Sequence, residues 1–224
     1  MIVLALEFSS SIRSVAILES SPARAPGKAS VLSCTSDAGA QAARPFTLIE
    51  RALTEARVER EAIACSAVGL GPGSYTGIRS SIAIAQGWQL ARQVTLSAVS
   101  SVEALGLQAQ QLGWYGLLHF AIDAQRGEFY VADYEITETK LATLQPLRLA
   151  KLAEVQRLSD SGEIVAGPGL QVRLPQARDL FPNAAAIGLL AAGRDGIVSG
   201  EKLEPIYLRE TAFVKAPPPR HPGT

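Results

Sequence analysis

A glycine-rich stretch in the middle of the chain places the tightest constraint on its fold. Residues 71–77 read Gly-Pro-Gly-Ser-Tyr-Thr-Gly. Residues 63–70 are mostly apolar, which predicts a buried strand, and residues 77–92 lack proline, which predicts a helix. A strand, a glycine-rich turn and a helix in this order can direct backbone N–H groups toward an anion. A tight strand-to-helix turn without a ligand fits the same pattern, and the sequence leaves both interpretations open.

Two common functional motifs do not fit this loop. No Gly-Lys-Ser/Thr follows the turn, so the lysine of a Walker-type phosphate loop is missing. Ser74 follows Gly73 directly, which excludes the spacing of a Gly-x-Ser-x-Gly nucleophile elbow. Arg79 is either a surface or capping arginine, or it forms a salt bridge that fixes the loop or a partner. The residues assigned to the glycine loop are Gly71, Pro72, Gly73, Ser74, Tyr75, Thr76, Gly77 and Arg79.

The predicted helix carries a narrow stripe of small side chains. At about 100° per residue, four small residues share one side of the helix and two large apolar residues flank them. A helix that is apolar over most of its circumference is usually buried on two sides. One side would face the chain's own sheet, and the other a second helix or another chain. The candidate partner interface consists of Ser80, Ala83, Ile84, Gly87, Trp88 and Ala91. The alternative is that the stripe faces the chain's own sheet.

The composition excludes several classes of protein. The chain has 224 residues, 47% of them hydrophobic, which is enough for one large domain or two small ones. Equal numbers of basic and acidic residues, 21 of each, give no overall positive charge for binding nucleic acid. Cys34 and Cys65 form no Cys-x-x-Cys pattern and no disulfide framework. The apolar run before Glu7 is too short for a signal peptide or a membrane span, so we expect a cytosolic protein.

The same order of elements occurs twice along the chain. Hydrophobic patterns predict strands at 2–6, 14–18, 29–35 and 93–98, and helices at 46–57 and from Ser100 onward, around the central strand, loop and helix. They also predict strands at 117–122, 129–134, 141–149 and 163–166, with a helix at 151–157. Placing Ala5-Leu6-Glu7 over Ala121-Ile122-Asp123 aligns the two series. We therefore predict an α/β chain of two similar halves.

Four segments resemble the TsaB family, also called YeaZ, whose members take part in making threonylcarbamoyladenosine on transfer RNA. In chain order they are Leu4-Ala-Leu-Glu-Phe-Ser-Ser, Gly71-Pro-Gly-Ser-Tyr-Thr-Gly-Ile-Arg, Asp123-Ala-Gln-Arg-Gly-Glu-Phe-Tyr and Pro205-Ile-Tyr-Leu-Arg. The resemblance implies a duplicated ribonuclease-H-like fold, as in actin-like ATPases. We expect halves at 1–104 and 105–215, meeting near residues 100–110, and the composition of 216–224 predicts a disordered tail.

The resemblance implies a partner subunit without catalysis of its own. A larger paralogue, TsaD, would transfer the threonylcarbamoyl group and pair with the small-residue stripe, and a small ATPase, TsaE, would join them. Alone, the chain would form a homodimer, and it would reach transfer RNA only through the complex. No metal or tightly bound cofactor is implied, and a nucleotide would fit only at an interface within the complex. The chain departs from the family pattern at Glu7, where Asp is usual, and at Ala42-Ala43, where a His-Ser pair is frequent.

A small-molecule kinase or ATPase of the same fold is the alternative function. Such an enzyme holds magnesium nucleotide between hairpins whose glycines let backbone N–H groups approach phosphate. The first hairpin instead places Phe8 after Glu7, and the second has no glycine before Gly127. Gly167-Pro168-Gly169 is either a remnant of an adenine-side loop or an ordinary turn. The residues assigned to vestigial phosphate hairpins are Glu7, Ser9, Ser10, Asp123 and Arg126, of which the last two also fit a charged turn without a ligand.

A serine hydrolase is disfavoured because no histidine is in a suitable position. A catalytic triad needs a histidine base that is held by an acid. His119 lies in the middle of a predicted strand, where a core histidine is expected, and His221 lies in the predicted tail.

Overall fold

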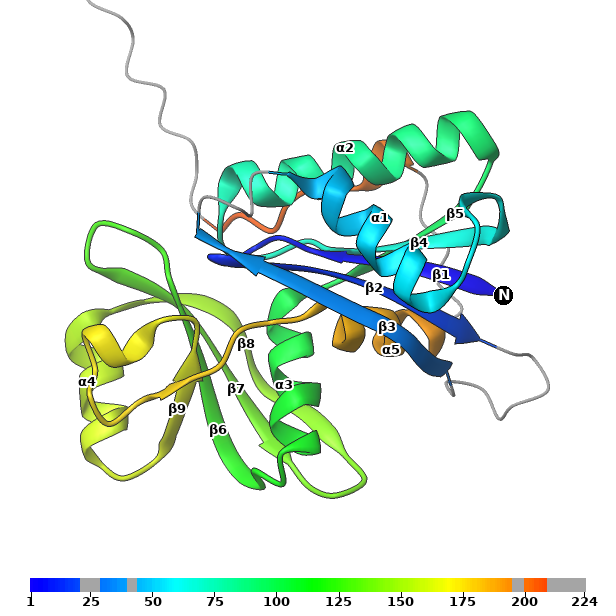
Figure 1. Ribbon diagram of the computed structural model, residues 1–224. Coiled ribbons are helices and arrows are strands. Elements are labelled where there is room, and N and C mark those ends of the chain that lie inside the picture. Colours follow the sequence, from blue (N-terminus) through cyan, green and yellow to red (C-terminus); the bar gives the residue numbers. More distant parts are fainter. Residues whose placement is uncertain (21–28, 40–43, 195–199, 209–224) are drawn as a thin grey trace, which may run out of the picture.

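The computed structural model describes residues 1–20, 29–39, 44–194 and 200–208, which form two lobes (Figure 1). The first lobe is built on a five-stranded sheet with the order β3-β2-β1-β4-β5. Its strands are β1 (Ile2–Glu7), β2 (Ile12–Ser20), β3 (Ala29–Ala38), β4 (Ile63–Gly69) and β5 (Thr95–Val99). The predicted tail at 216–224, His221 and Ala42-Ala43 lie outside the described residues.

The second lobe repeats the arrangement of the first. Its sheet has the order β10-β9-β6-β7-β8. The strands are β6 (Gly116–Asp123), β7 (Glu128–Ile136), β8 (Leu141–Lys151), β9 (Ile164–Gly167) and β10 (Arg178–Asp179). In each lobe the first three strands form an antiparallel meander, and the last two run parallel to the first. The prediction of two similar halves is therefore confirmed.

The helices repeat in the same order, with one exception. They are α1 (Pro45–Ala56), α2 (Tyr75–Arg92), α3 (Ser101–Gln111), α4 (Leu152–Asp160) and α5 (Ala184–Ala192), with short 3-10 turns η2 (Arg60–Ala62), η3 (Leu170–Val172) and η4 (Gly200–Lys202). The predicted helix at 77–92 begins at Tyr75, because the Ser74 hydroxyl caps it by accepting from the Gly77 N–H. In the second series the three-residue turn η3 stands where the first has α2. Gly167-Pro168-Gly169, which leads from the last residue of β9 into η3, is thus the counterpart of the glycine loop.

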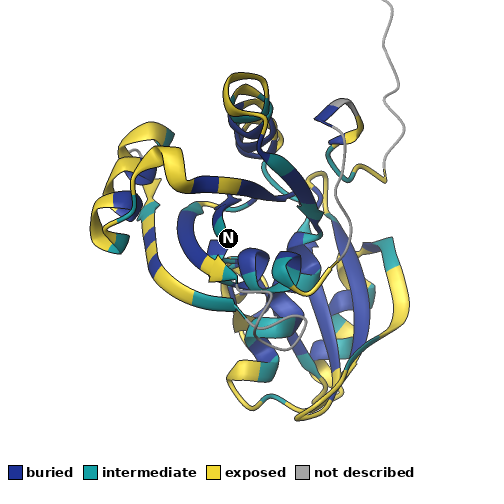
Figure 2. Cartoon of the chain, turned by 90° about the vertical axis from the view of Figure 1, so that its right-hand side faces the viewer, coloured by how far each residue is buried: buried dark blue, intermediate teal, exposed yellow. Residues whose placement is uncertain are grey.

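Alternate residues of the strands enter different cores, because side chains alternate between the two faces of a sheet. Leu4 and Leu6 of β1 pack with α1 and α2, whereas Val3 and Ala5 pack with α5. Figure 2 shows the result as dark blue strands inside and yellow outer sides on the helices. No described helix combines the length and hydropathy that a membrane span requires.

Helices α3 and α5 join the two lobes. Val102 and Leu105 of α3 belong to the core of the second lobe, while Ala104 belongs to a core of the first. Helix α5 follows the second sheet in sequence but packs on β1, β2 and β3 of the first. The expected boundary between residues 104 and 105 therefore falls inside a helix that both lobes share.

Candidate functional site

The glycine loop packs against the first hairpin of the chain. The Ser74 N–H donates to the Ser9 carbonyl oxygen at 2.6 Å. Gly73 has a φ of +147°, and a Cβ added there would collide with the same carbonyl. Gly77 lies in the first turn of α2, where an added Cβ would collide with the Phe8 carbonyl oxygen. Packing of the hairpin against the start of α2 thus explains these glycines without a ligand, as the tight-turn interpretation requires.

Glu7 connects this loop to the start of α3 from a fully buried position. Its carboxylate accepts from the Ser9 N–H and from the Ser101 hydroxyl, each at 2.6 Å. The Ser101 hydroxyl in turn accepts from the Gly71 N–H at 3.1 Å, and the Ser101 N–H donates to the Gly71 carbonyl at 2.9 Å. Gly69 leaves room for the carboxylate, because a Cβ there would overlap it. Burial raises the pKa of Glu7 above its ordinary 4.5, and the hydrogen bonds from Ser101 and Ser9 oppose that shift.

A cleft of about 740 Å³ separates the two hairpins. Ser9, Ser10 and Asp123 line it, whereas the Glu7 carboxylate is buried outside it. Asp123 accepts from the Gln125 N–H at 2.8 Å and pairs with Arg173 at 3.4 Å. The structure therefore brings only part of the vestigial phosphate hairpins together in the cleft, and the Asp123 carboxylate is already engaged within its own lobe.

The second hairpin turns through left-handed residues. Gln125, Arg126 and Gly127 have φ values of 64°, 58° and 77°. This turn shape accounts for Gly127 without a phosphate. Among the described residues, no group of three or more His, Cys, Asp or Glu side chains converges in a way that could hold a metal ion.

His119 is a core histidine whose two ring nitrogens both bind carboxylates. Its Nδ1 lies 2.7 Å from Asp133 Oδ1, and its Nε2 lies 2.5 Å from Glu163 Oε2. The side chain is only 6% exposed. Because both nitrogens are engaged, neither is free to act as a base for a serine, which agrees with the expectation of a core histidine.

The small-residue stripe of α2 faces outward. Ala83, Gly87 and Ala91 are exposed, and a Cβ added at Gly87 would meet no atom within 4 Å. The opposite side of the helix packs into the first core through Ile78 and Ala85. The alternative that the stripe faces the chain's own sheet is therefore wrong.

This stripe forms one wall of an apolar groove of about 570 Å³ between α1 and α2. Phe46 and Ile49 of α1 form the opposite wall, and Phe46 is 63% exposed. Ion pairs Arg60–Glu50 and Arg92–Glu61 lie along its rim. An apolar centre with a charged rim is typical of a protein–protein interface. The sequence analysis did not identify Phe46 as a site residue. The apolar spacing in residues 46–57 predicts a helix but does not indicate which of its apolar side chains remain exposed.

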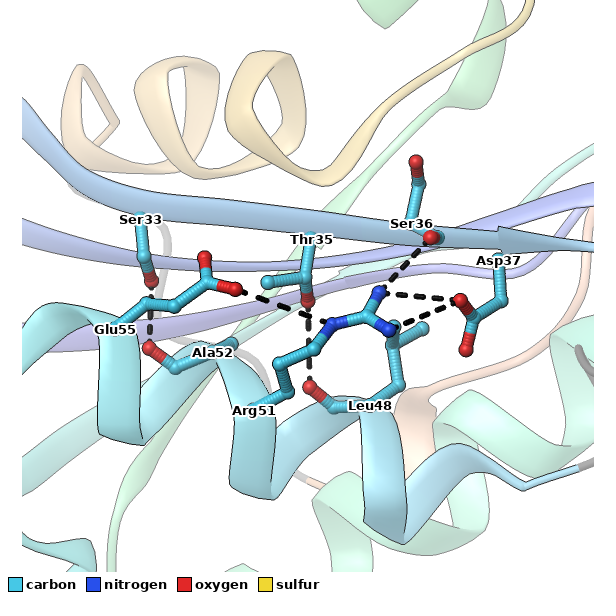
Figure 3. A network of polar contacts seen from close by, with 8 residues as sticks. All are labelled: Ser33, Thr35, Ser36, Asp37, Leu48, Arg51, Ala52 and Glu55. Atoms are coloured by element: carbon cyan, nitrogen blue, oxygen red, sulfur yellow. Dashed lines mark hydrogen bonds and ion pairs between the residues drawn. The ribbon is translucent and has the colours of Figure 1, made fainter.

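Polar contacts fix α1 on the edge strand β3 and so define the groove (Figure 3). The hydroxyls of Ser33 and Thr35 donate to main-chain carbonyls of α1 at 2.7 and 3.3 Å. Arg51 binds Asp37 at 3.1 Å and the Ser36 carbonyl at 2.9 Å. The groove wall is therefore held by both hydrogen bonds and apolar packing.

Two tyrosines hold Arg79 at the N-terminal end of α2. Its guanidinium carbon lies 4.1 Å from the ring centroid of Tyr75, which stacks on Tyr207 with centroids 5.5 Å apart. Arg79 also donates a hydrogen bond to the Tyr207 hydroxyl. Burial raises the pKa of Tyr207 above its ordinary value, and the hydrogen bond and charge of Arg79 oppose part of that shift. The Ile206 N–H donates to the Leu70 carbonyl at 2.9 Å and fixes the segment that carries Tyr207. The sequence analysis did not place Tyr207 beside the loop. The only signal for it in the sequence was its position in Pro205-Ile-Tyr-Leu-Arg, the last of the four segments that resemble the family.

Comparisons with known proteins agree over most of the chain. A family model described as TsaD, tRNA N6-adenosine threonylcarbamoyltransferase, matches residues 41–210. The tRNA threonylcarbamoyladenosine biosynthesis protein TsaB of Escherichia coli (strain K12) is 30% identical over an alignment of 200 residues, gaps included, and the match covers 78% of this chain and 83% of that protein. The solved structure of YeaZ from Pseudomonas aeruginosa has a TM-score of 0.73 and 29% identity, covering 92% of this chain and 99% of that one.

A second solved structure is described as an uncharacterized protein with similarity to peptidase YeaZ from Pseudomonas aeruginosa. It has a TM-score of 0.74 and 27% identity, and covers 93% of this chain and 99% of its own. The two likenesses span both lobes. The predicted duplicated ribonuclease-H-like fold is therefore confirmed.

Alanine substitutions test whether the loop glycines serve packing. We expect Gly73→Ala to lower the free energy of unfolding by more than about 1 kcal/mol, because it combines a positive φ with a collision. Gly77→Ala should also destabilise, by about 1–3 kcal/mol, because the Phe8 carbonyl leaves no room. Gly87→Ala is the matched control in the same helix and should stabilise by up to about 1 kcal/mol. Denaturant unfolding measures all three, and equal stabilities would contradict the packing role.

The raised pKa of Glu7 predicts a pH-dependent stability. Between pH 4.5 and the raised value the folded state binds more protons than the unfolded state, so the free energy of unfolding falls as the pH rises. Glu7→Gln keeps a side chain that can accept from Ser9 but removes the titration. The variant should therefore lose less stability than the unmodified chain over this interval in denaturant titrations. Identical pH slopes for the two proteins would contradict this assignment.

Proposed function

Because the chain belongs to the TsaB (YeaZ) family, we propose that it is a subunit of the machinery that makes N6-threonylcarbamoyladenosine on transfer RNA. In this proposal it is a non-catalytic partner that scaffolds and activates a TsaD paralogue, the transferase of the complex. A TsaE ATPase joins the two, and transfer RNA is reached through the complex in the cytoplasm. The observation that carries the proposal is the outward-facing stripe of α2 beside the apolar groove.

The groove is proposed as the contact surface for TsaD. Small side chains at Ala83 and Gly87 let another backbone approach α2 closely, and the exposed ring of Phe46 offers a large apolar contact. The family model that matches this chain is that of TsaD, so the proposed partner has a related fold. Without TsaD, a second copy of the chain would cover the same groove.

The cleft supports a role without catalysis. Binding of magnesium nucleotide would need free carboxylates and a close backbone approach to phosphate. Glu7 is instead bound to Ser9 and Ser101, Asp123 is bound to Arg173, and the ring of Phe8 is fully buried in the first hairpin. We therefore propose that the isolated chain holds no nucleotide tightly, and that any nucleotide in the complex lies at the interface with a partner.

Arginine substitutions on the stripe test the interface. Ala83→Arg and Gly87→Arg should leave the chain folded, because both positions face outward. Each should abolish pairing with TsaD and any self-dimer, because an unpaired cation buried in an apolar interface costs several kcal/mol, roughly 3–5. Ala153→Arg, on an exposed position of α4, is the matched control and should pair normally.

Circular dichroism and size-exclusion chromatography with recombinant TsaD from the same organism distinguish the outcomes. A folded Gly87→Arg variant that binds TsaD with unchanged affinity would refute the proposed interface.

ATP turnover tests the alternative of a kinase or ATPase. The purified chain with Mg²⁺ should hydrolyse ATP no faster than the Glu7→Ala and Asp123→Ala variants, because neither carboxylate is free in the cleft. ATP hydrolysis by the unmodified chain that either substitution abolishes would show that this chain is an ATPase and would contradict the non-catalytic proposal.

A further inference from the structure

Arg79 is an exposed cation without a carboxylate partner among the described residues. The described ion pairs bring acidic side chains to arginines of α1, α2 and the second lobe, but none to Arg79. Its contacts are instead the ring of Tyr75 and the hydroxyl of Tyr207. A guanidinium on an aromatic ring keeps its N–H groups available for a planar anionic group such as a carboxylate.

The glycine loop does not need Arg79 for its conformation. The loop is held by the Ser74–Ser9 bond and by the two bonds between Gly71 and Ser101. Of the two roles that the sequence allowed for a salt bridge of Arg79, fixing the loop is therefore already filled by main-chain and serine contacts. The interpretations that remain are a surface arginine and contact with a partner.

The position of Arg79 continues the proposed interface. Arg79, Ala83 and Gly87 are spaced at four-residue intervals and are all exposed, so they follow one another along the outer side of α2. Tyr75 is 53% exposed and Tyr207 is 38% exposed beside this line. Tyrosine and arginine are the residue types that most often dominate interface energies. Because the two rings already order the arginine, little side-chain entropy is left to lose on binding.

We propose that Arg79 binds a carboxylate of the TsaD-type partner at the N-terminal end of α2. This inference rests on the proposed function, since it places the anion on the same partner that covers the stripe. A protein carboxylate is favoured over an RNA phosphate for two reasons. The next outward positions along α2, Ala83 and Gly87, carry no polar side chain, and a phosphate backbone makes no use of such a surface. The chain as a whole has no net positive charge.

The test measures the dissociation constant for recombinant TsaD at low and high salt. Arg79→Ala should weaken binding by at least about tenfold and should flatten its salt dependence, because a charge pair is lost. Arg79→Lys keeps the charge but lacks the planar guanidinium group. Its affinity for TsaD should therefore lie between those of the unmodified chain and Arg79→Ala. Arg178→Ala is the matched control, because Arg178 also lies over an aromatic ring, 4.7 Å from the centroid of Trp114, in the other lobe. It should bind as the unmodified chain does.

Several results would overturn the proposal. Unchanged affinity of Arg79→Ala is one, and a loss of affinity with unchanged salt dependence is another. Glu210→Gln removes the acid of this chain that follows the described segment; if it reproduces the loss, Arg79 pairs within its own chain. If Arg79→Ala leaves TsaD binding intact but weakens binding of transfer RNA, the anion is a phosphate. If both Arg79→Ala and Gly87→Arg leave TsaD binding intact, the proposed function itself fails. If Gly87→Arg weakens TsaD binding and Arg79→Ala does not, only the Arg79 contact is contradicted.

Discussion

The buried carboxyl group of Glu7 is the contact on which the arrangement of the first lobe depends. Through Ser101 it fixes the first residue of α3, and through Ser101 and Gly71 it fixes the glycine loop that leads into α2. The Glu7 side chain thus holds in place the N-terminal ends of two helices. They are α3, which joins the lobes, and α2, which is proposed to contact the partner. The Glu7 carboxylate fits at this point because Gly69 has no side chain. The hydrogen bonds of Glu7 fix this junction between the loop and the two helices, and its burial removes the carboxyl group from the cleft.

The sequence predicted β1 to β9, their order along the chain and the duplication, because these follow from local hydrophobic patterns, but it predicted neither β10 nor α5. It did not predict what the loop glycines make room for, since the carbonyls of Phe8 and Ser9 come from a hairpin more than sixty residues earlier in the chain. The helical period separated the faces of α2, but only the fold decided that Ala83 and Gly87 point outward. The contact of Tyr207 with Arg79 joins residues far apart in sequence and leaves no periodic signal. Local order could therefore be predicted, and the long-range contacts that define the candidate site could not.

The two hairpins line a cleft, and their acidic side chains are engaged in contacts within the fold. Asp123 closes its own turn and meets Arg173, as Glu7 meets Ser101. The molecule thus combines a cleft, whose lining carboxylate of Asp123 is engaged, with an apolar groove whose wall is exposed. The exposed apolar surface of the first lobe lies in the groove between α1 and α2, where the proposed partner would bind.

The replacement of α2 by the short turn η3 in the second lobe has a consequence for assembly. A duplicated chain with two equal copies would offer a partner two pseudo-equivalent docking faces, and binding could occur in either orientation or at both faces together. With the helix present in one copy only, the pseudosymmetry is broken at the place where recognition would occur. The chain itself then sets the stoichiometry of a complex built on α2 and the orientation of the bound partner. The second lobe can change in sequence without creating a second docking surface.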